Sequence, residues 1–277
     1  MNIILTGIPR SGTTLTCTLL NHCPQTVALH EPMAPSRLAG LPPAAIVEEI
    51  QGFFNCQRQS LLREGMAISK SRGGQIPSNP FMEEITPGAL RQSIVGNGMV
   101  HFGKSLTTEF QLVIKQPNAF TALLDVLKSC FPCFAIIRNP LAVLLSWQSI
   151  NAPVNRGHIP MAEAFDPELA RRLGEEEDRI SRQIMILDWY FCRYHDLLPG
   201  DHVIRYENIV ESGGAALSLI DPDASRIRES LESRNCNRLY DATMAVPLAR
   251  RLLSHKDHGY RNFYRDCDIE QLMWSWA

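Results

Sequence analysis

Short apolar runs alternate with longer amphipathic stretches along this chain. The first run ends at Gly7, and the next two stop before Pro32 and Pro117, because a strand interior does not tolerate proline. Two further runs of the same kind follow in the second half of the chain. The pattern therefore predicts five strands, at residues 2–6, 26–30, 112–115, 134–137 and 202–206.

Helical stretches fill the intervals between these runs. Leu15, Leu19 and Leu20 supply the apolar residues of the first. The expected helices are 14–21, 119–129, 141–150 and 167–197. Strands that alternate with helices are typical of a parallel sheet built from βαβ units. We therefore expect an α/β fold with a central parallel β-sheet flanked by helices, and a single domain over 1–277, because the sequence has no internal repeat and no linker.

Two regions do not join this alternation. Residues 33–110 contain one amphipathic stretch around Ile46 and Phe54, then a Gly/Ser/Asn/Pro-rich part at 69–97 that predicts loops. We interpret 33–110 as a variable acceptor-side insertion, and a purely structural excursion is the alternative. Residues 221–277 are expected to be helical first and then irregular, with a basic segment at 250–259.

Composition narrows the class of protein. The 277 residues are 45% hydrophobic and 20% charged, which excludes disordered, collagen-like and coiled-coil chains. The formal net charge of −2 gives no field that attracts nucleic acid or an anionic membrane. Any anionic ligand must therefore be bound by a local pocket, and we expect no nucleic-acid partner.

The eight cysteines are too dilute for a disulfide scaffold and favour a reducing, cytoplasmic location. Cys130 and Cys133 form a CxxC between a predicted helix and a predicted strand, whereas a redox CxxC opens a helix. They are expected to be structural. No segment approaches the ~20 apolar residues of a membrane span, so we expect a soluble chain. The oligomeric state stays open.

A phosphate-binding loop is predicted between the first strand and the first helix. Residues 7–14 read Gly-Ile-Pro-Arg-Ser-Gly-Thr-Thr, with the glycine spacing of the nucleoside triphosphatase motif G-x-x-x-x-G-K-[ST]. Thr13 replaces the lysine that reaches the terminal phosphates of ATP, and Arg10 stands inside the loop. The backbone N–H groups of residues 11–14, at the positive end of the helix dipole, would still bind a phosphate.

Residues 10–14, Arg-Ser-Gly-Thr-Thr, resemble the 5′-phosphosulfate loop of sulfotransferases that use 3′-phosphoadenosine-5′-phosphosulfate (PAPS). Residues 136–140, Ile-Ile-Arg-Asn-Pro, followed by Ser146, are similar to that family's 3′-phosphate motif. Arg138 ends a strand and Ser146 lies in the next helix, so the two can share one phosphate. An ordinary strand end capped by Asn139 is the alternative. The resemblance implies that the donor is bound by Arg10, Ser11, Gly12, Thr13, Thr14, Arg138, Ser146 and Tyr206.

Weaker similarities extend the resemblance. Lys115, at the end of the third strand, is similar to the family's K-x-P segment, whose lysine meets the bridging or leaving oxygen. Trp189 and Tyr194 resemble its W-x-x-x-x-Y helix. Tyr206 resembles a tyrosine that lies near the adenine or the 3′-phosphate in many members. Packing in the core is the alternative for these aromatic residues.

Two neighbouring residues compete as the base that takes the acceptor's proton. Glu31 lies 21 residues after Arg10, a spacing that resembles the tyrosylprotein and several bacterial sulfotransferases, which carry a catalytic glutamate there. Strand alternation should point His30 to the opposite face, so only one of the two should face the donor. The cytosolic branch uses a histidine two residues after the lysine, where this chain has Pro117. We therefore expect Glu31 to be the base.

The resemblance implies a PAPS-dependent sulfotransferase that acts on a small-molecule or peptide hydroxyl. Glu31 would be the general base, and Lys115 and Arg10 would neutralise the leaving phosphate. No metal is expected, because the donor has no triphosphate to chelate one. A phosphate-loop small-molecule kinase and a non-catalytic nucleotide-binding module are the alternatives.

Two expectations are looser. The basic segment resembles a C-terminal loop that closes over the 3′-phosphate in some members, with Arg250, Arg251 and Lys256 as candidates and a solvated basic stretch as the alternative. Apolar residues of the insertion favour an apolar or aromatic acceptor alcohol, although they could equally form core. These residues are Phe53, Phe54, Met66, Phe81, Met82 and Phe102.

Overall fold

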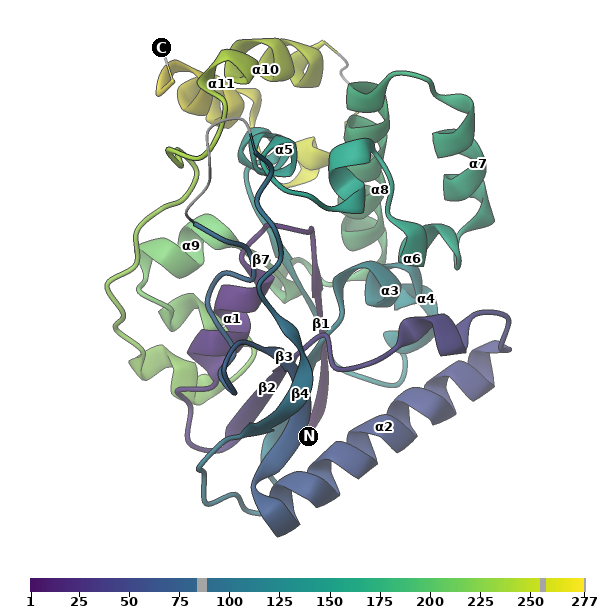
Figure 1. The fold of residues 1–277 in the computed structure, drawn as a ribbon, viewed down its shortest axis with the longest axis vertical. Helices are drawn as coiled ribbons and strands as arrows, with labels where there is room; N and C mark the ends of the chain where they lie inside the picture. Colours follow the sequence, from purple (N-terminus) through teal and green to yellow (C-terminus); the bar gives the residue numbers. More distant parts are fainter. Residues whose placement is uncertain (84–88, 255–257, 277) are drawn as a thin grey trace.

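The computed structural model describes residues 1–83, 89–254 and 258–276. Five parallel strands form a central sheet with helices on both faces, which confirms the predicted α/β fold (Figure 1). The strand order is β2-β5-β1-β6-β7. The bounds are β1 (Asn2–Gly7), β2 (Thr26–His30), β5 (Gln111–Lys115), β6 (Cys133–Ile137) and β7 (Val203–Arg205). The last strand is shorter than predicted, because its expected ends belong to a 3₁₀ turn (Gly200–His202) and to α9 (Tyr206–Glu211).

The sheet has two apolar faces because the side chains of successive strand residues alternate. Ile3 and Leu5 of β1 face α1 (Thr13–Leu20), α9 and the 3₁₀ turns Ala215–Leu219 and Pro222–Arg226. Ile4 faces the larger cluster, which includes the helices drawn to the right of the sheet in Figure 1. Both faces of β1 are therefore fully buried.

The larger face is covered by helices that are shorter than the sequence predicts. The expected helix at 119–129 divides at Leu123. The expected helix at 167–197 divides before Asp178, whose side chain accepts the N–H of Ser181 and caps a new helix. The observed helices are α3 (Pro117–Ala122), α4 (Leu124–Leu127), α5 (Pro140–Gln148), α6 (Pro160–Glu163), α7 (Pro167–Glu175) and α8 (Arg179–Leu197), with a 3₁₀ turn at Pro153–Arg156.

The insertion contains more regular structure than the sequence predicts. After a 3₁₀ turn (Pro35–Leu38), the expected amphipathic helix is α2 (Pro43–Glu64), whose inward side buries Ile50 and Phe54. The prediction of loops over 69–97 is wrong at both ends of that range. There β3 (Met66–Ser71) pairs with β4 (Gly96–His101) in an antiparallel hairpin. The strand β4 could not be predicted because its glycines have no side chains that could form the apolar and polar alternation of a strand.

The C-terminal region reverses its expected order, being irregular first and helical afterwards. A 3₁₀ turn at Ala242–Met244 leads into α10 (Ala245–Leu253), and a second turn at Gly259–Asn262 precedes α11 (Asp266–Trp274). Leu248, Ala249 and Leu252 give α10 a buried apolar stripe, which was hidden by the neighbouring arginines. Both helices contact α5. Within the described ranges, no helix combines the length and the apolar character needed to cross a bilayer.

Candidate functional site

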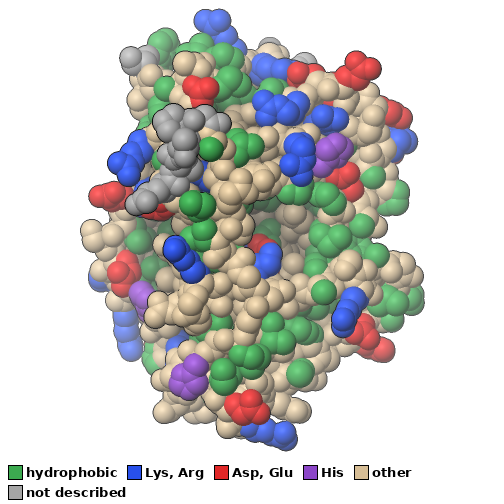
Figure 2. Space-filling view, in the orientation of Figure 1, with side chains coloured by type: hydrophobic (Ala, Val, Ile, Leu, Met, Phe, Trp, Pro, Cys, Tyr) green, Lys and Arg blue, Asp and Glu red, His purple; other side chains and the backbone are tan. Residues whose placement is uncertain are grey.

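A pocket of about 760 Å³ opens at the carboxyl edge of the parallel sheet. The residues that follow the strands meet in its wall: Arg10 after β1, Glu31 after β2, Lys115 at the end of β5, Arg138 after β6 and Tyr206 after β7. Figure 2 shows the molecule hollowed near the centre of this face, with acidic and basic side chains inside the hollow. Ligands of open α/β sheets bind at such strand ends, where the connecting helices diverge to opposite faces.

The two glycines of the predicted phosphate loop are required by its geometry. Gly7 has φ 149°, and a Cβ atom there would lie 2.5 Å from the carbonyl oxygen of Ile136. Gly12 has φ 92°, and its Cβ would lie 2.6 Å from the ring of Tyr206. Thr13 and Thr14 follow in the first turn of α1, where backbone N–H groups have no intrahelical acceptor. The loop therefore presents donors to the pocket.

Ser11 does not join the donors that we expected from residues 11–14. Its N–H donates to the carbonyl of Ile8 at 3.0 Å, and its hydroxyl donates to the carbonyl of Ile136 at 2.6 Å. The side chain is fully buried. Ser11 therefore bonds the loop to β6. Of the four expected donor residues, Gly12, Thr13 and Thr14 remain.

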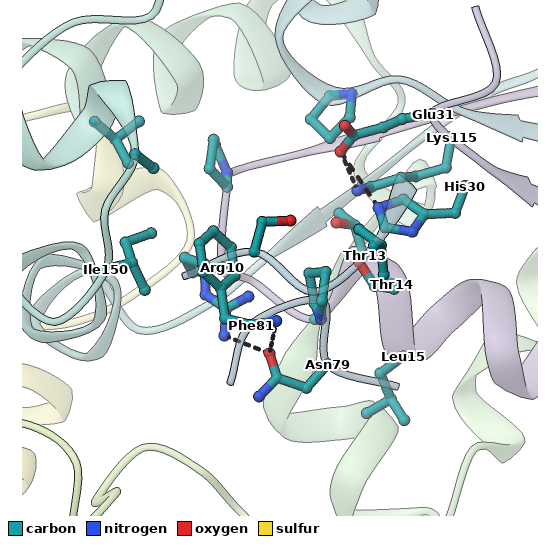
Figure 3. A pocket seen from close by; sticks show the side chains of 18 of the residues that line it. Arg10, Thr13, Thr14, Leu15, His30, Glu31, Asn79, Phe81, Lys115 and Ile150 are labelled. Atoms are coloured by element: carbon teal, nitrogen blue, oxygen red, sulfur yellow. Dashed lines mark hydrogen bonds and ion pairs between the residues drawn. The ribbon is translucent and has the colours of Figure 1, made fainter. Parts of the chain in front are cut away.

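Glu31 lies between two lysines. Its Oε1 is 2.6 Å from the Lys115 Nζ, and its Oε2 is 2.6 Å from the Nζ of Lys70 on the β3–β4 hairpin. The Nε2 of His30 is 3.5 Å from Oε1. Figure 3 shows His30, Glu31 and Lys115 grouped on one side of the pocket.

The expectation that His30 and Glu31 point to opposite faces is wrong. Alternation holds only while the chain stays extended, and β2 ends at His30. Glu31 has φ 45°, a left-handed conformation that is uncommon outside glycine. This turn brings its carboxylate back to the histidine, so both side chains line the pocket.

The charges of this group distinguish the two candidate bases. Burial alone would raise the pKa of Glu31, but the Lys115 ammonium, with His30 and Lys70, holds it well below its usual value. Burial, with Lys115 adding to it, lowers the pKa of His30 to about 4. At neutral pH His30 is therefore neutral and Glu31 is a carboxylate. Both nitrogens of His30 are buried, and its Nδ1 has no hydrogen-bond partner in the described structure.

Arg10 lies apart from the Glu31–Lys115 pair. Its Nη2 donates to Asn79 at 2.9 Å, its Nε donates to the Ser146 hydroxyl at 3.3 Å, and its guanidinium stacks on Phe81. Figure 3 shows Arg10, Asn79 and Phe81 as a separate group. Burial lowers the pKa of Arg10 to about 10, which leaves it charged at neutral pH.

Of the predicted pair Arg138 and Ser146, Arg138 lines the pocket, whereas Ser146 is fully buried and is not among the lining residues. Both are buried, and Arg10 and Tyr240 lie between them. The guanidinium of Arg138 donates to the carbonyls of Arg10 and Arg234 and to the Asn235 side chain. It also lies over the ring of Tyr206, with 4.8 Å from Cζ to the ring centre.

For Tyr206, Tyr194, Trp189 and Asn139, the structure shows which side chains line the pocket and which pack in the core or cap a helix. Tyr206 packs on the phosphate loop at Gly12 and lines the pocket. Tyr194 is fully buried and bonds Thr121, and Trp189 donates to Asp166, so core packing accounts for both. Asn139 caps α5 by accepting the N–H groups of Leu141 and Ala142, beside an Arg138 that still faces the pocket.

Lys70, Arg91 and Tyr240 are among the pocket residues that the sequence did not single out. Lys70 and Arg91 lie in the range for which loops were predicted, and Tyr240 lies in the first part of 221–277, which was expected to be helical. The alternation of β3, in which Ala67 and Ser69 are buried, was the available signal for Lys70. Arg91 and Tyr240 reach the pocket through tertiary contacts, which leave no local pattern.

The looser expectations are mostly not met. Of the apolar residues proposed for the acceptor, Phe81 alone lines the pocket; Phe54 is core, and Met82 is exposed. Arg250 is exposed, and Arg251 pairs with Asp178 at 2.6 Å, away from the pocket lining. Lys256 lies outside the described residues.

Cys130 is exposed and follows α4, Cys133 is buried as the first residue of β6, and both are free thiols. In the part of the chain that the structure describes, no group of three or more His, Cys, Asp or Glu side chains could hold a metal ion. No protein-family model matches the chain, and a search of curated proteins found no match. The function is therefore argued from the site alone.

Proposed function

We propose that this protein is a PAPS-dependent sulfotransferase that sulfates the hydroxyl group of a small molecule or peptide. The observation that carries the proposal is the position of the Glu31–Lys115 pair beside a lysine-free phosphate loop. A carboxylate can take a proton from an alcohol, and a lysine next to it can stabilise a leaving phosphate. Both groups border one pocket with the N-terminus of α1.

The residues present fit a nucleotide with two anionic groups. The first turn of α1 offers N–H donors, and Arg10 and Arg138 offer cations in the same pocket, with the buried Ser146 hydroxyl holding the Nε of Arg10. Tyr206 offers an aromatic face next to the loop. When bound, PAPS would supply the sulfuryl group and a stable bisphosphate leaving group.

The chain's residues would then act in order. Glu31, ionised at neutral pH, accepts the proton of the acceptor hydroxyl as its oxygen bonds to sulfur and the bond from sulfur to the phosphate oxygen breaks. Lys115 stabilises the charge that develops on that phosphate oxygen. Arg10 contributes once its guanidinium exchanges Asn79 and Ser146 for the nucleotide's phosphate. His30 stays neutral and orients Glu31.

Two measurements test the proposal. Transfer of labelled sulfate from PAPS to a panel of phenols, alcohols and tyrosine peptides should give a sulfated product. In thermal unfolding, 3′,5′-adenosine bisphosphate should raise the midpoint, while ATP with Mg²⁺ should not, because Thr13 replaces the loop lysine. Stabilisation by ATP with Mg²⁺ and not by the bisphosphate would favour the kinase alternative. Bisphosphate binding without transfer to any acceptor would favour the non-catalytic module.

A further inference from the structure

Three arginines from separate segments of the chain crowd one end of the pocket. Arg10 follows β1, Arg138 follows β6, and Arg91 belongs to the insertion, between β3 and β4. Among the residues that the structure describes, none of the three forms an ion pair with a carboxylate. This end of the pocket therefore has an excess of positive charge.

The two carboxylates whose charges act on Arg91 and Arg138 are already engaged. Glu83, whose charge acts on Arg91, accepts from Asn79 and lies 3.8 Å from the guanidinium of Arg234. Glu207, whose charge acts on Arg138, accepts from Tyr264 and from the backbone of Asn139. Neither carboxylate neutralises the cluster at close range.

Arg91 is fixed in place more firmly than a residue of a surface loop. Its N–H donates to the carbonyl of Ser149 at 3.0 Å, and its carbonyl accepts the N–H of Asn151 at 2.9 Å. Its Nη2 donates to the Ser149 hydroxyl at 2.7 Å, and that hydroxyl donates to the carbonyl of Ser146 at 2.8 Å. The insertion is thus bonded to the end of α5, directly beside Ser146.

The guanidinium of Arg91 is buried without full compensation. Its side chain lines the pocket, the residue is only 1% exposed, and its Nε has no hydrogen-bond partner in the described structure. Burial lowers its pKa, the charges of Tyr240 and Glu83 oppose this shift, and those of Arg138 and Arg234 add to it. A buried cation that is not in contact with a carboxylate is costly. An anion bound between these arginines removes that cost, and a guanidinium fork suits phosphate oxygens.

We propose that Arg91 binds the 3′-phosphate of the donor nucleotide together with Arg138, so that the insertion makes the pocket selective for nucleotides that carry this group. The inference rests on the proposed function, since it assumes that a nucleotide's 5′ end lies on the phosphate loop. It assigns the insertion a part in donor recognition as well as in acceptor binding.

The test compares 3′,5′-adenosine bisphosphate with adenosine 5′-monophosphate, titrated by calorimetry into the wild type and Arg91→Met. We expect the variant to lose about 10- to 100-fold in affinity for the bisphosphate and less than about threefold for the monophosphate. A partly unfolded sample does not change the ratio of the two affinities, because unfolded protein lowers the number of binding sites equally in both titrations. Arg58→Met is the matched control, since Arg58 bonds carbonyls near the start of β1, and its ratio should stay that of the wild type.

The inference is overturned if the ratio of the two affinities in Arg91→Met is that of the wild type, either because neither affinity changes or because both fall by the same factor. If that variant does not fold, Arg91→Gln removes the charge while keeping a donor for Ser149, and the same two outcomes decide. A wild-type protein that binds no bisphosphate would instead refute the proposed function. The two failures are therefore distinguishable.

Discussion

At the scale of single residues, the candidate site depends on how one carboxylate is held between cations. Glu31 combines a left-handed backbone, two lysine partners at 2.6 Å and a neutral histidine neighbour. The lysines keep it ionised, which a base requires, although they also weaken its intrinsic basicity. These two effects together suit a carboxylate that accepts the proton of the acceptor hydroxyl only while the hydroxyl oxygen bonds to sulfur.

Replacing the carboxylate tests this assignment directly. Glu31→Gln keeps the size of the side chain but cannot take a proton at neutral pH. We expect kcat for sulfate transfer to fall by about 10²- to 10⁴-fold while the affinity for 3′,5′-adenosine bisphosphate changes little. Steady-state kinetics and calorimetry measure the two quantities. Full activity in Glu31→Gln would remove Glu31 as the base and leave His30 to be tested.

Lys70 makes a separate prediction about pH. Its charge lowers the pKa of Glu31, so Lys70→Met should raise that pKa and move the acid limb of the kcat/KM profile to higher pH. The pair is about a third exposed on the lysine side, and such pairs contribute about 0.2–1 kcal/mol. The shift should therefore be a few tenths of a pH unit. Lys70→Arg, which keeps the charge, should leave the limb in place, and a downward shift in Lys70→Met would contradict the reading.

At the scale of elements, the loop at residues 7–12 and α1 form one unit with the start of α9. The ring of Tyr206, the first residue of α9, fills the space that a side chain at position 12 would occupy. The glycine spacing of the loop therefore has two causes: a left-handed backbone and the close approach of an aromatic ring.

Two glycine-to-alanine substitutions, one in this loop and one in a helix, separate these two causes from the effect that alanine has on stability at any position. Gly12→Ala should destabilise the fold by about 1–3 kcal/mol and abolish nucleotide binding, because φ is 92° and the new Cβ meets Tyr206. Gly52→Ala, inside α2 with open space around it, should stabilise by about 0.5–1 kcal/mol. Urea unfolding measures both. A Gly12→Ala protein as stable as the wild type would show that the loop adapts freely.

The sequence predicted the elements whose signal is local and missed those whose signal is not. The five buried strands and the glycine loop were found because apolar runs and turn residues mark them directly. The hairpin was missed because β4 begins Gly-Asn-Gly and has no apolar period. The pairing of Glu31 with Lys70, and the reach of Arg91 to Ser149, depend on chain segments about 40 and 60 residues apart, which no local pattern encodes.

At the scale of the whole molecule, the site and the stability of the fold share residues. His30 is buried at the end of β2, its N–H donates to the hydroxyl of Ser69, and its ring remains uncharged. A group with a lowered pKa in the folded state favours the unfolded, protonated state as the pH falls. Part of the acid sensitivity of the entire fold should therefore come from one histidine of the pocket.

This linkage can be measured. Between about pH 6.5 and 4 the unfolded chain binds a proton at His30 that the folded chain does not, so the free energy of unfolding should decrease as the pH is lowered through this window. His30→Gln should remove a decrease on the order of 2–3 kcal/mol over the window. Urea titrations at pH 7 and pH 4.5 give the difference, with the exposed His101→Gln as control. Equal pH dependence in His30→Gln and the wild type would refute the assignment.

The two ends of the β3–β4 segment lie side by side, since the N–H of Phe102 donates to the carbonyl of Gly65 at 3.0 Å. The hairpin pairs with itself and adds no strand to the parallel sheet. A segment with adjacent ends can be lengthened or replaced at a small entropic cost to the rest of the chain. Provided that the Ser69 bond to β2 and the Arg91 bonds to Ser149 and Asn151 are kept, exchanging the rest of this segment should alter the pocket wall while the five strand ends stay in register. The fold thus separates the five strand ends of the pocket from a wall segment that design can replace as a module.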